Sequence, residues 1–343
     1  MRHALLLALL LLPTVTLAAA PAQPSPGLPG AAGPGPRLTP LRLNPQPGTL
    51  LEYRVHSTSE VMALRPDVWS LDPELVDGVL AGALHEEGLL SGPMWEGLRE
   101  VFSPPLPDAK FFVRVLAPQQ PDTVRLALTY LRPDIAGVPG SRLEIRTEHT
   151  LRPDGTVLDG KLRWPSTGAE FLEELDAEML WQVALGNAGF DPAGVFGGQA
   201  SQVVQASGEV QLALDRVLTE GLGEGLLDGV GPVVSTVTTR PQQPTADGSV
   251  QRTFLQQISA QPWEATVLWT GEHGDPVSAP YALRRRDTEV LSRYRTDGLP
   301  EASQLTGLMR STLGLPSSGE VPYQLVMHMT TRYTVQTDLM KVQ

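Results

Sequence analysis

Hydrophobic and polar side chains alternate over the last part of the chain, between residues 321 and 339. Odd positions such as Tyr323, Met329 and Val335 are mostly apolar, whereas even positions such as Arg332 and Gln336 are polar. Because successive side chains of a strand point to opposite faces of a sheet, this pattern predicts a long strand with one apolar face. Such a strand must bend, twist or carry a bulge, since ordinary strands have about five or six residues.

The same alternation predicts further strands in the rest of the chain. They are expected at residues 50–62, 110–116, 123–131, 142–152, 156–164, 233–239, 248–260, 263–271 and 281–295. Residues 303–312 fit a strand or a helix equally well. Arg-x-Asp-Gly occurs at 152–155 and again at 295–298, and an Asp-Gly pair between two alternating runs is typical of a hairpin turn. The repeated motif gives one hypothesis, an internal duplication with a break near residues 190–232, and the match is short.

One well-defined amphipathic helix is predicted at residues 167–187, where Thr167 and Glu170 would form a capping box. Shorter helical patterns at 73–84 and 93–102 resemble a cap on a sheet. Residues 209–231 have near-helical spacing interrupted by glycines, and fit a helix or a loop. We therefore expect an α+β fold, with a large curved antiparallel sheet that is half-open and barrel-like, and with helices packed on its concave face.

The amino-terminal region has the pattern of an export signal. Arg2 precedes an apolar block that is too short to span a bilayer, and Ala20-Pro21-Ala22 is an A-x-A cleavage site. We assign residues 1–22 to a signal peptide, with an uncleaved anchor as the alternative. Residues 23–47 are rich in Pro, Gly and Ala, which predicts a disordered linker. Residues 48–343 would form a single β-rich domain.

Composition narrows the possible partners and chemistry. The chain has no cysteine and a formal net charge of −12. It therefore has no thiol nucleophile, disulfide, iron–sulfur cluster or zinc ribbon, and the acidic balance disfavours nucleic acid as a partner. We also expect no transmembrane segment after the signal peptide is removed.

Motifs of known catalytic mechanisms are missing from the sequence. There is no G-x-S-x-G, H-E-x-x-H or G-x-x-x-x-G-K-[ST] motif, and no two histidines lie two or four residues apart. Four glutamates between residues 170 and 178 lie opposite the apolar stripe of the predicted helix, as expected for a solvated face. We predict no catalytic residue, no metal site and no cofactor.

Large apolar side chains are more numerous than thin sheets need. Wide rings and flexible thioethers suit a cavity that holds variable apolar ligands, although an ordinary hydrophobic core would use the same residues. The residues predicted to line such a cavity are Trp164, Phe171, Leu175, Met179, Trp181, Val183, Met327 and Met329.

Several of these patterns together resemble the LolA/LppX-type lipoprotein carriers of bacterial envelopes. The resemblance rests on the opening run from Gly48 to Tyr53, the two Asp-Gly hairpins, the helix at 167–187 and the terminal strand. It implies a signal peptide, a long antiparallel sheet and helices lodged against one side of it. No functional residue of that family matches a position in this chain.

These observations lead to an expected function. The leading hypothesis is a non-enzymatic, exported cell-envelope protein, periplasmic or extracellular, that binds a lipid or other apolar ligand between sheet and helix. One alternative is a structural or adhesive envelope component that binds a protein partner. A second alternative, with fewer supporting features, is a hydrolase.

Overall fold

The computed structural model describes the chain in separate stretches. These are residues 20–21, 41–70, 107–133, 142–164, 175–191, 195–196, 201–206, 226–228, 233–241, 252–270, 276–314 and 323–343. The helical patterns predicted at 73–84 and 93–102, most of the signal peptide and residues 23–40 of the linker lie outside these stretches.

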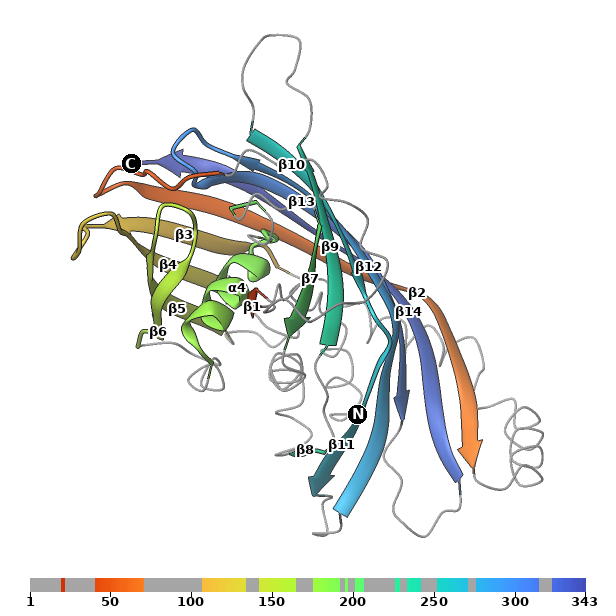
Figure 1. The fold of residues 1–343 in the computed structure, drawn as a ribbon. Helices are drawn as coiled ribbons and strands as arrows, with labels where there is room; N and C mark the ends of the chain where they lie inside the picture. Colours follow the sequence, from red (N-terminus) through yellow and green to blue (C-terminus); the bar gives the residue numbers. More distant parts are fainter. Residues whose placement is uncertain are drawn as a thin grey trace, which may run out of the picture.

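The described residues form mainly β-strands (Figure 1). The strands are β1 (Ala20–Pro21), β2 (Leu50–Ser70), β3 (Ala109–Leu116), β4 (Val124–Pro133), β5 (Arg142–Leu151), β6 (Val157–Leu162), β7 (Ser201–Ala206), β8 (Leu226–Asp228), β9 (Val233–Pro241), β10 (Arg252–Ala260), β11 (Trp263–Thr270), β12 (Pro276–Tyr294), β13 (Pro300–Gly314) and β14 (Tyr323–Val342). A helix, α4 (Ala177–Asn187), lies between β6 and β7 in the chain.

All these strands belong to one 14-stranded sheet with antiparallel pairing. Its order is β1-β7-β9-β10-β12-β13-β14-β2-β3-β4-β5-β6, and β11 and β8 branch from β12. From β2 to β6 and from β12 to β14, neighbours in the sheet are also consecutive in the chain, whereas β14, the last strand, pairs with β2. That pair runs from Val342 opposite Leu51 to Tyr323 opposite Ser70, so residues from the two ends of the predicted domain lie side by side.

The large antiparallel sheet is confirmed, but the predicted α+β class with several helices against the sheet is wrong. Among the described residues α4 is the one helix, and the fold is mainly β. Helix α4 also begins later than predicted, at Ala177 and not at Thr167. The Asp176 side chain caps it by accepting a 2.8 Å hydrogen bond from the Met179 N–H. Residues 303–312 form strand because β13 is paired on both sides, with β12 and β14.

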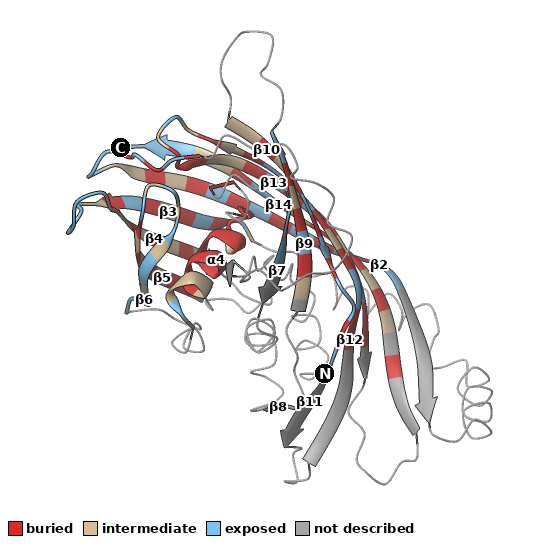
Figure 2. Ribbon diagram, viewed as in Figure 1, coloured by how far each residue is buried: buried red, intermediate tan, exposed pale blue. Residues whose placement is uncertain are grey.

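The long strands bend as they cross the sheet (Figure 1). The β14–β2 ladder shifts register between Thr330 and Thr331 and again between Leu339 and Lys341, and such bulges bend a strand and increase its twist. Burial alternates along β14 as predicted, since Tyr333 and Val335 are buried and Arg332 is exposed (Figure 2). The buried positions share the face of the sheet that α4 contacts, which we call the inner face; the other is the outer face.

The two Arg-x-Asp-Gly segments form turns with the same hydrogen bonds. In each turn the glycine N–H donates to the arginine C=O, at 2.9 Å in residues 152–155 and 3.0 Å in residues 295–298. The aspartate side chain accepts from the N–H two residues later, at 3.0 and 3.1 Å. The glycine φ angles are 82° and 83°, a conformation that favours glycine. The duplication itself stays a prediction.

A short segment before β2, residues 41–46, runs between these two turns, and we call it the strap. The Leu43 N–H donates to the Pro153 C=O at 2.7 Å, and the Asn44 N–H donates to the Asp297 C=O at 2.9 Å. The Leu43 side chain is 2% exposed and belongs to the main core cluster. The carboxyl end of the predicted linker is therefore packed against the sheet and its turns.

Helix α4 connects two separated parts of the sheet. Its body contacts β6, β5 and β4. Beyond its carboxyl end, Thr337 Oγ1 of β14 donates to the Ala188 C=O, and Ser303 Oγ of β13 donates to the Gly189 C=O, both at 2.6 Å. These bonds satisfy carbonyl groups that a helix end leaves unpaired. The helix therefore spans the inner face from β4–β6 to β13–β14.

Candidate functional site

The residues predicted to line an apolar cavity have different environments. Trp181, Val183 and Met329 are buried in the core cluster, and Leu175 and Met179 pack against it with partial exposure. Trp164 is 54% exposed, because it follows the end of β6 and no longer takes part in the strand alternation. Phe171 and the side chain of Met327 lie outside the described residues.

Three of these predicted residues, Met179, Trp181 and Val183, lie in α4, and the contacts of that helix resemble a packed core. Val183 is fully buried, and Trp181 meets the ring of His149 edge-on, with ring centroids 5.3 Å apart. The first turn of the helix lies directly on β6: a Cβ added at Gly160 would be 2.9 Å from the Ala177 Cα. Close packing here fixes α4 against β5 and β6.

His149 is buried beneath the helix without a polar partner. Neither ring nitrogen forms a hydrogen bond, and burial lowers its pKa to about 3, against a smaller opposing effect of Glu148. A histidine in this setting is neutral at neutral pH and is not positioned to transfer a proton to a substrate. We regard it as part of the helix–sheet contact.

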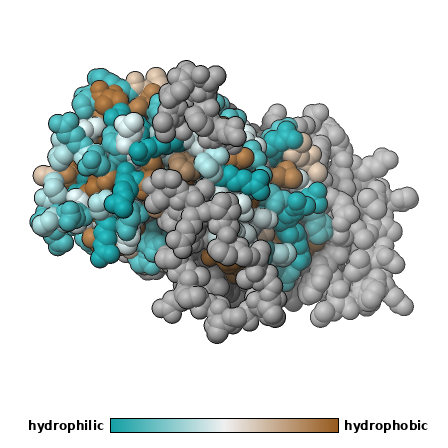
Figure 3. Space-filling model, turned by 45° about the horizontal axis from the view of Figure 1, so that its top comes forward, coloured by the Kyte–Doolittle hydropathy of each residue, from teal (hydrophilic) through white to brown (hydrophobic). Residues whose placement is uncertain are grey.

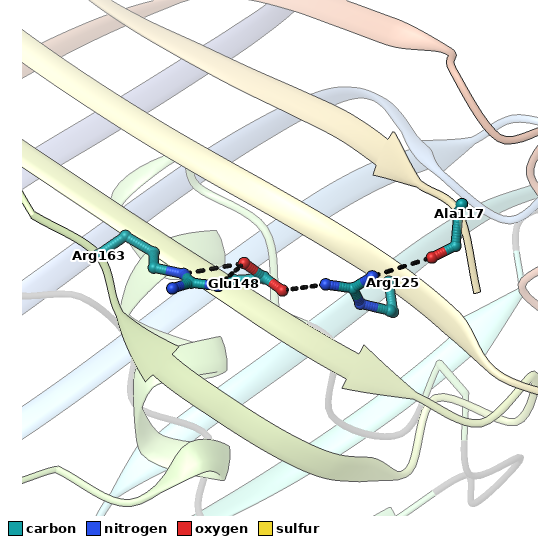
Figure 4. Close-up of polar contacts among 4 residues, drawn as sticks. All are labelled: Ala117, Arg125, Glu148 and Arg163. Atoms are coloured by element: carbon teal, nitrogen blue, oxygen red, sulfur yellow. Dashed lines mark hydrogen bonds and ion pairs between the residues drawn. The ribbon is translucent and has the colours of Figure 1, made fainter. Parts of the chain in front are cut away.

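The outer face of β4–β6, opposite α4, carries an ion-pair network that fixes β6 to its neighbours (Figure 4). Glu148 accepts hydrogen bonds from Arg125 and Arg163, and Arg125 also donates to the Ala117 C=O at 3.1 Å. Burial alone would raise the pKa of Glu148, but the two arginines lower it below its usual value. The network has one carboxylate and two cations that satisfy it, so its evident role is structural.

Aromatic rings form a continuous cluster on the inner face next to α4. Phe190, just beyond the helix, lies 6.3 Å from the ring centroids of both Tyr53 and Tyr294. Tyr53 in turn contacts Phe111, and Tyr294 contacts Phe196. This cluster is the apolar part of the inner face.

Farther along the strands the same face becomes mixed. Buried arginine, hydroxyl and amide side chains alternate there with buried apolar residues such as Val237 and Met309. This inner polar band consists of Ser57, Ser59, Arg132, Ser235, Thr239, Gln256, Arg286, Thr288, Ser311 and Thr331. Several of its atoms have no hydrogen-bond partner, including Arg132 Nη1, Thr239 Oγ1 and Ser311 Oγ. Buried polar atoms in native proteins are normally paired with protein groups, ordered water or a ligand.

Arg132 is at the carboxyl end of β4 and is only 6% exposed. Its Nε donates to Tyr130 Oη at 2.9 Å, and its Nη2 reaches past β3 to donate to Ser57 Oγ of β2 at 3.0 Å. The guanidinium also lies 5.8 Å from the centroid of the Tyr130 ring. All these partners are neutral.

Arg286 of β12 is the second buried arginine in the band. Its Nε donates to Tyr333 Oη at 3.2 Å, and the same hydroxyl shares a 2.6 Å hydrogen bond with Thr288 Oγ1. The Tyr333 ring reaches these groups by passing over β13 at Gly307, where the absence of a side chain leaves room for it. In each case a long side chain spans an intervening strand: Arg132 itself reaches past β3, and Tyr333 reaches Arg286 across β13.

Sequence reasoning missed this band, although a signal for it exists. Arg132 has the same parity as Leu126, Leu128 and Tyr130, so strand alternation places it on the buried face. The run Arg284-Arg285-Arg286 fits a solvated strand face, and the first two are exposed, but Arg286 is buried. A charged residue at a strand position where alternation predicts an apolar one is the signal that identifies both Arg132 and Arg286 as buried.

A groove of about 650 Å³ lies on the outer face over β9, β10 and β12–β14. Its walls combine hydroxyl groups with both signs of charge, including Arg285, Asp287, Glu289 and Arg332. Asp287 is already engaged by Arg285 and by Ser259 Oγ at 2.9 Å. Figure 3 shows mainly hydrophilic residues on the described surface in that view, with smaller hydrophobic patches between them.

Metal sites and membrane-spanning helices are both missing from the described part of the chain. Nowhere in it do three His, Asp or Glu side chains come together as a metal site. Helix α4, the one described helix, is too short to cross a bilayer. Comparison with known proteins found no family model and no curated protein that matches this chain.

Proposed function

We propose that this protein is a non-enzymatic, exported component of the cell envelope that binds an amphipathic, lipid-like molecule on its inner face. The observation that carries the proposal is the juxtaposition there of an aromatic cluster and a buried polar band. Tyr53 and Phe190 are at most 1% exposed and make this part of the inner face apolar, while Arg132 and the hydroxyl groups without partners offer donors for a polar head. Ligand sites of this kind combine a mainly apolar lining with a few placed polar groups.

Two features of the sequence support the cellular setting. Residues 1–22 have the pattern of a secretory signal. The resemblance to LolA/LppX-type carriers would place the protein in the periplasm or at the cell surface. Amino-terminal sequencing of the exported protein is expected to begin at Gln23; a protein retained in the cytoplasm with Met1 would contradict the assignment.

The test of binding is native mass spectrometry of the protein purified from envelope fractions under mild conditions, followed by delipidation and titration with oleate. We expect a bound lipid-sized adduct and saturable oleate binding. A second titration with a hydrophilic anion of similar charge, such as acetate, serves as the control. A protein that is empty after purification and shows no saturable binding of oleate would contradict the proposal.

A second candidate function follows from the outer groove, whose mixed charges suit a polar partner protein. Arg332 lines this groove, whereas Arg310 is exposed on the neighbouring strand outside it. Cross-linking in envelope fractions should capture a partner that Arg332→Glu loses and Arg310→Glu keeps. Equal capture by both variants would exclude the groove as the contact.

A further inference from the structure

Arg132 combines burial with an incomplete set of partners. Its side chain uses Nε and Nη2 on neutral oxygens, whereas Nη1 is buried and has no hydrogen-bond partner. An arginine side chain cannot lose its proton in a protein and carries five N–H donors. Of these five donors, the two on Nη1 make no hydrogen bond.

A buried cation without an anion is costly, and native proteins normally pair it with a carboxylate, a phosphate or a metal-bound group. None of the ion pairs within the described part of the chain includes Arg132. The Tyr130 ring and hydroxyl offset part of this cost through cation–π and hydrogen-bond contacts. They leave the positive charge itself uncompensated.

The neighbouring groups fix the guanidinium instead of neutralising it. Tyr130 is 2% exposed and Ser57 is 1% exposed, so both partners are held in the packed sheet. They orient the planar guanidinium and leave the Nη1 edge for one more acceptor. A planar fork of this kind matches the geometry of a carboxylate or phosphate, which accepts two parallel N–H bonds.

We propose that Arg132 binds the oxyanion of the ligand, a carboxylate or phosphate group, through Nη1. Ser57 and Tyr130 act as positioning residues that hold the guanidinium. This inference rests on the proposed function and deepens it, because it makes the ligand anionic as well as amphipathic. The anion could come from a lipid head group or from a free phosphate, and the experiment below distinguishes them.

The experiment compares three probes on the purified protein: oleate, oleyl alcohol and inorganic phosphate. Oleate and oleyl alcohol share a chain and differ in head-group charge. We expect wild-type protein to bind oleate roughly 10- to 100-fold more tightly than the alcohol, the range of charged hydrogen bonds. Arg132→Met should remove this preference and leave alcohol binding unchanged.

Two controls separate a binding role from a structural one. Arg310→Met removes an exposed arginine of the outer face that does not line the groove, and it should keep the preference for oleate. Thermal unfolding should show that ligand-free Arg132→Met is at least as stable as wild type, since it no longer buries a cation. A less stable variant that still prefers oleate would show that Arg132 is structural and would overturn the proposal.

Failure of this inference and failure of the proposed function give different results. If oleate and oleyl alcohol bind equally well to wild type, the protein binds lipid and the role of Arg132 is overturned. If neither lipid binds but Arg132→Met abolishes phosphate binding, the anion site is supported and the proposed lipid-binding function is contradicted. If none of the three probes binds, both are overturned.

Discussion

Tyr333 of β14 lies across Gly307 of β13, so closely that a Cβ added at Gly307 would be 2.0 Å from the Cζ atom of the ring. The two residues are opposite each other in the strand ladder. Crossing the glycine brings the Tyr333 hydroxyl to Arg286 and Thr288 of the next strand. One missing side chain thus permits a hydrogen-bonded link across three strands.

Gly307→Ala should therefore destabilise the protein by about 1–3 kcal/mol, the usual cost of overpacking a core. The ring would have to move and abandon its buried partners. Tyr333→Phe keeps the ring over Gly307 and removes only the hydroxyl, so it isolates the hydrogen-bond contribution of about 1 kcal/mol. Urea unfolding measures both. A Gly307→Ala variant as stable as wild type would contradict this account of the contact.

His149 predicts a specific dependence of stability on pH. Its pKa of about 3 in the folded protein lies below the value of about 6.5 for an unfolded chain. Between these values the unfolded state binds a proton that the folded state does not, so stability should fall as pH decreases. The contribution of this group is about 1.4 kcal/mol per pH unit.

His149→Leu should remove this slope and, at neutral pH, stabilise the protein by about 1–3 kcal/mol by eliminating two unpaired buried nitrogens. Urea unfolding at several pH values between 4 and 8 tests both effects. His56 is exposed on the outer face, and His56→Gln serves as the control that keeps the slope. An unchanged slope in His149→Leu would show that other groups cause the pH dependence.

The strap contact can be tested with two glycines that differ in their surroundings. Gly298 and Gly48 both have positive φ, at 83° and 92°. A Cβ at Gly298 would be 2.3 Å from the Arg42 carbonyl oxygen, whereas Gly48 has nothing within 4 Å. Gly48→Ala should cost about 1–2 kcal/mol from backbone strain alone. Gly298→Ala should cost about 1–3 kcal/mol more, because the strap must move.

Denaturant unfolding of the two alanine variants measures this difference directly. Equal decreases in the free energy of unfolding would mean that the strap can move without loss of stability and does not hold the turns. Amide hydrogen exchange at Leu43 and Asn44 gives an independent signal, since both N–H groups donate to the turns. Their protection should decrease in Gly298→Ala and stay unchanged in Gly48→Ala.

The link between α4 and β14 predicts an asymmetry between two threonines of the same strand. Thr337→Val removes the donor to the buried Ala188 C=O and should cost about 1–3 kcal/mol. Thr334 forms an exposed hydrogen bond with Thr58 on the outer face, so Thr334→Val should change stability by less than about 0.5 kcal/mol. Thermal unfolding compares the two, and similar losses would show that α4 is not held by this bond.

Local patterns predicted much of this fold from the sequence. Alternation located β3–β6, β9–β12 and β14, and the Asp-Gly pairs located both turns, because each signal depends on a few neighbouring residues. The late start of α4 and the mainly β class were not predicted, and the choice between helix and strand for residues 303–312, now β13, was left open. Propensity alone could not decide between helix and strand for residues 303–312, whereas pairing with both neighbours did.

The site was less predictable than the fold. The predicted cavity residues Trp181 and Val183 are buried as expected, but burial does not distinguish a ligand cavity from a packed core. Trp164 was predicted to line the cavity because its ring is large and apolar. Its side chain is exposed because β6 ends at Leu162. Arg132 and Arg286 follow the strand alternation, yet a rule that assigns charged residues to the surface excludes them. The proposed anion site rests on the unpaired Nη1 of Arg132, which strand alternation does not reveal.

The pairing of β14 with β2 has a consequence for how the molecule folds. Val342 lies opposite Leu51, so the longest ladder of the sheet closes a loop of nearly the whole domain. Contacts of such sequence separation form slowly, because loop-closure entropy must be overcome before they stabilise anything. While the chain is being synthesised, β2 can pair with β3, but its other edge has no partner until β14 emerges. The sheet can therefore form its longest ladder only once residues 323–342 are free to pair with β2.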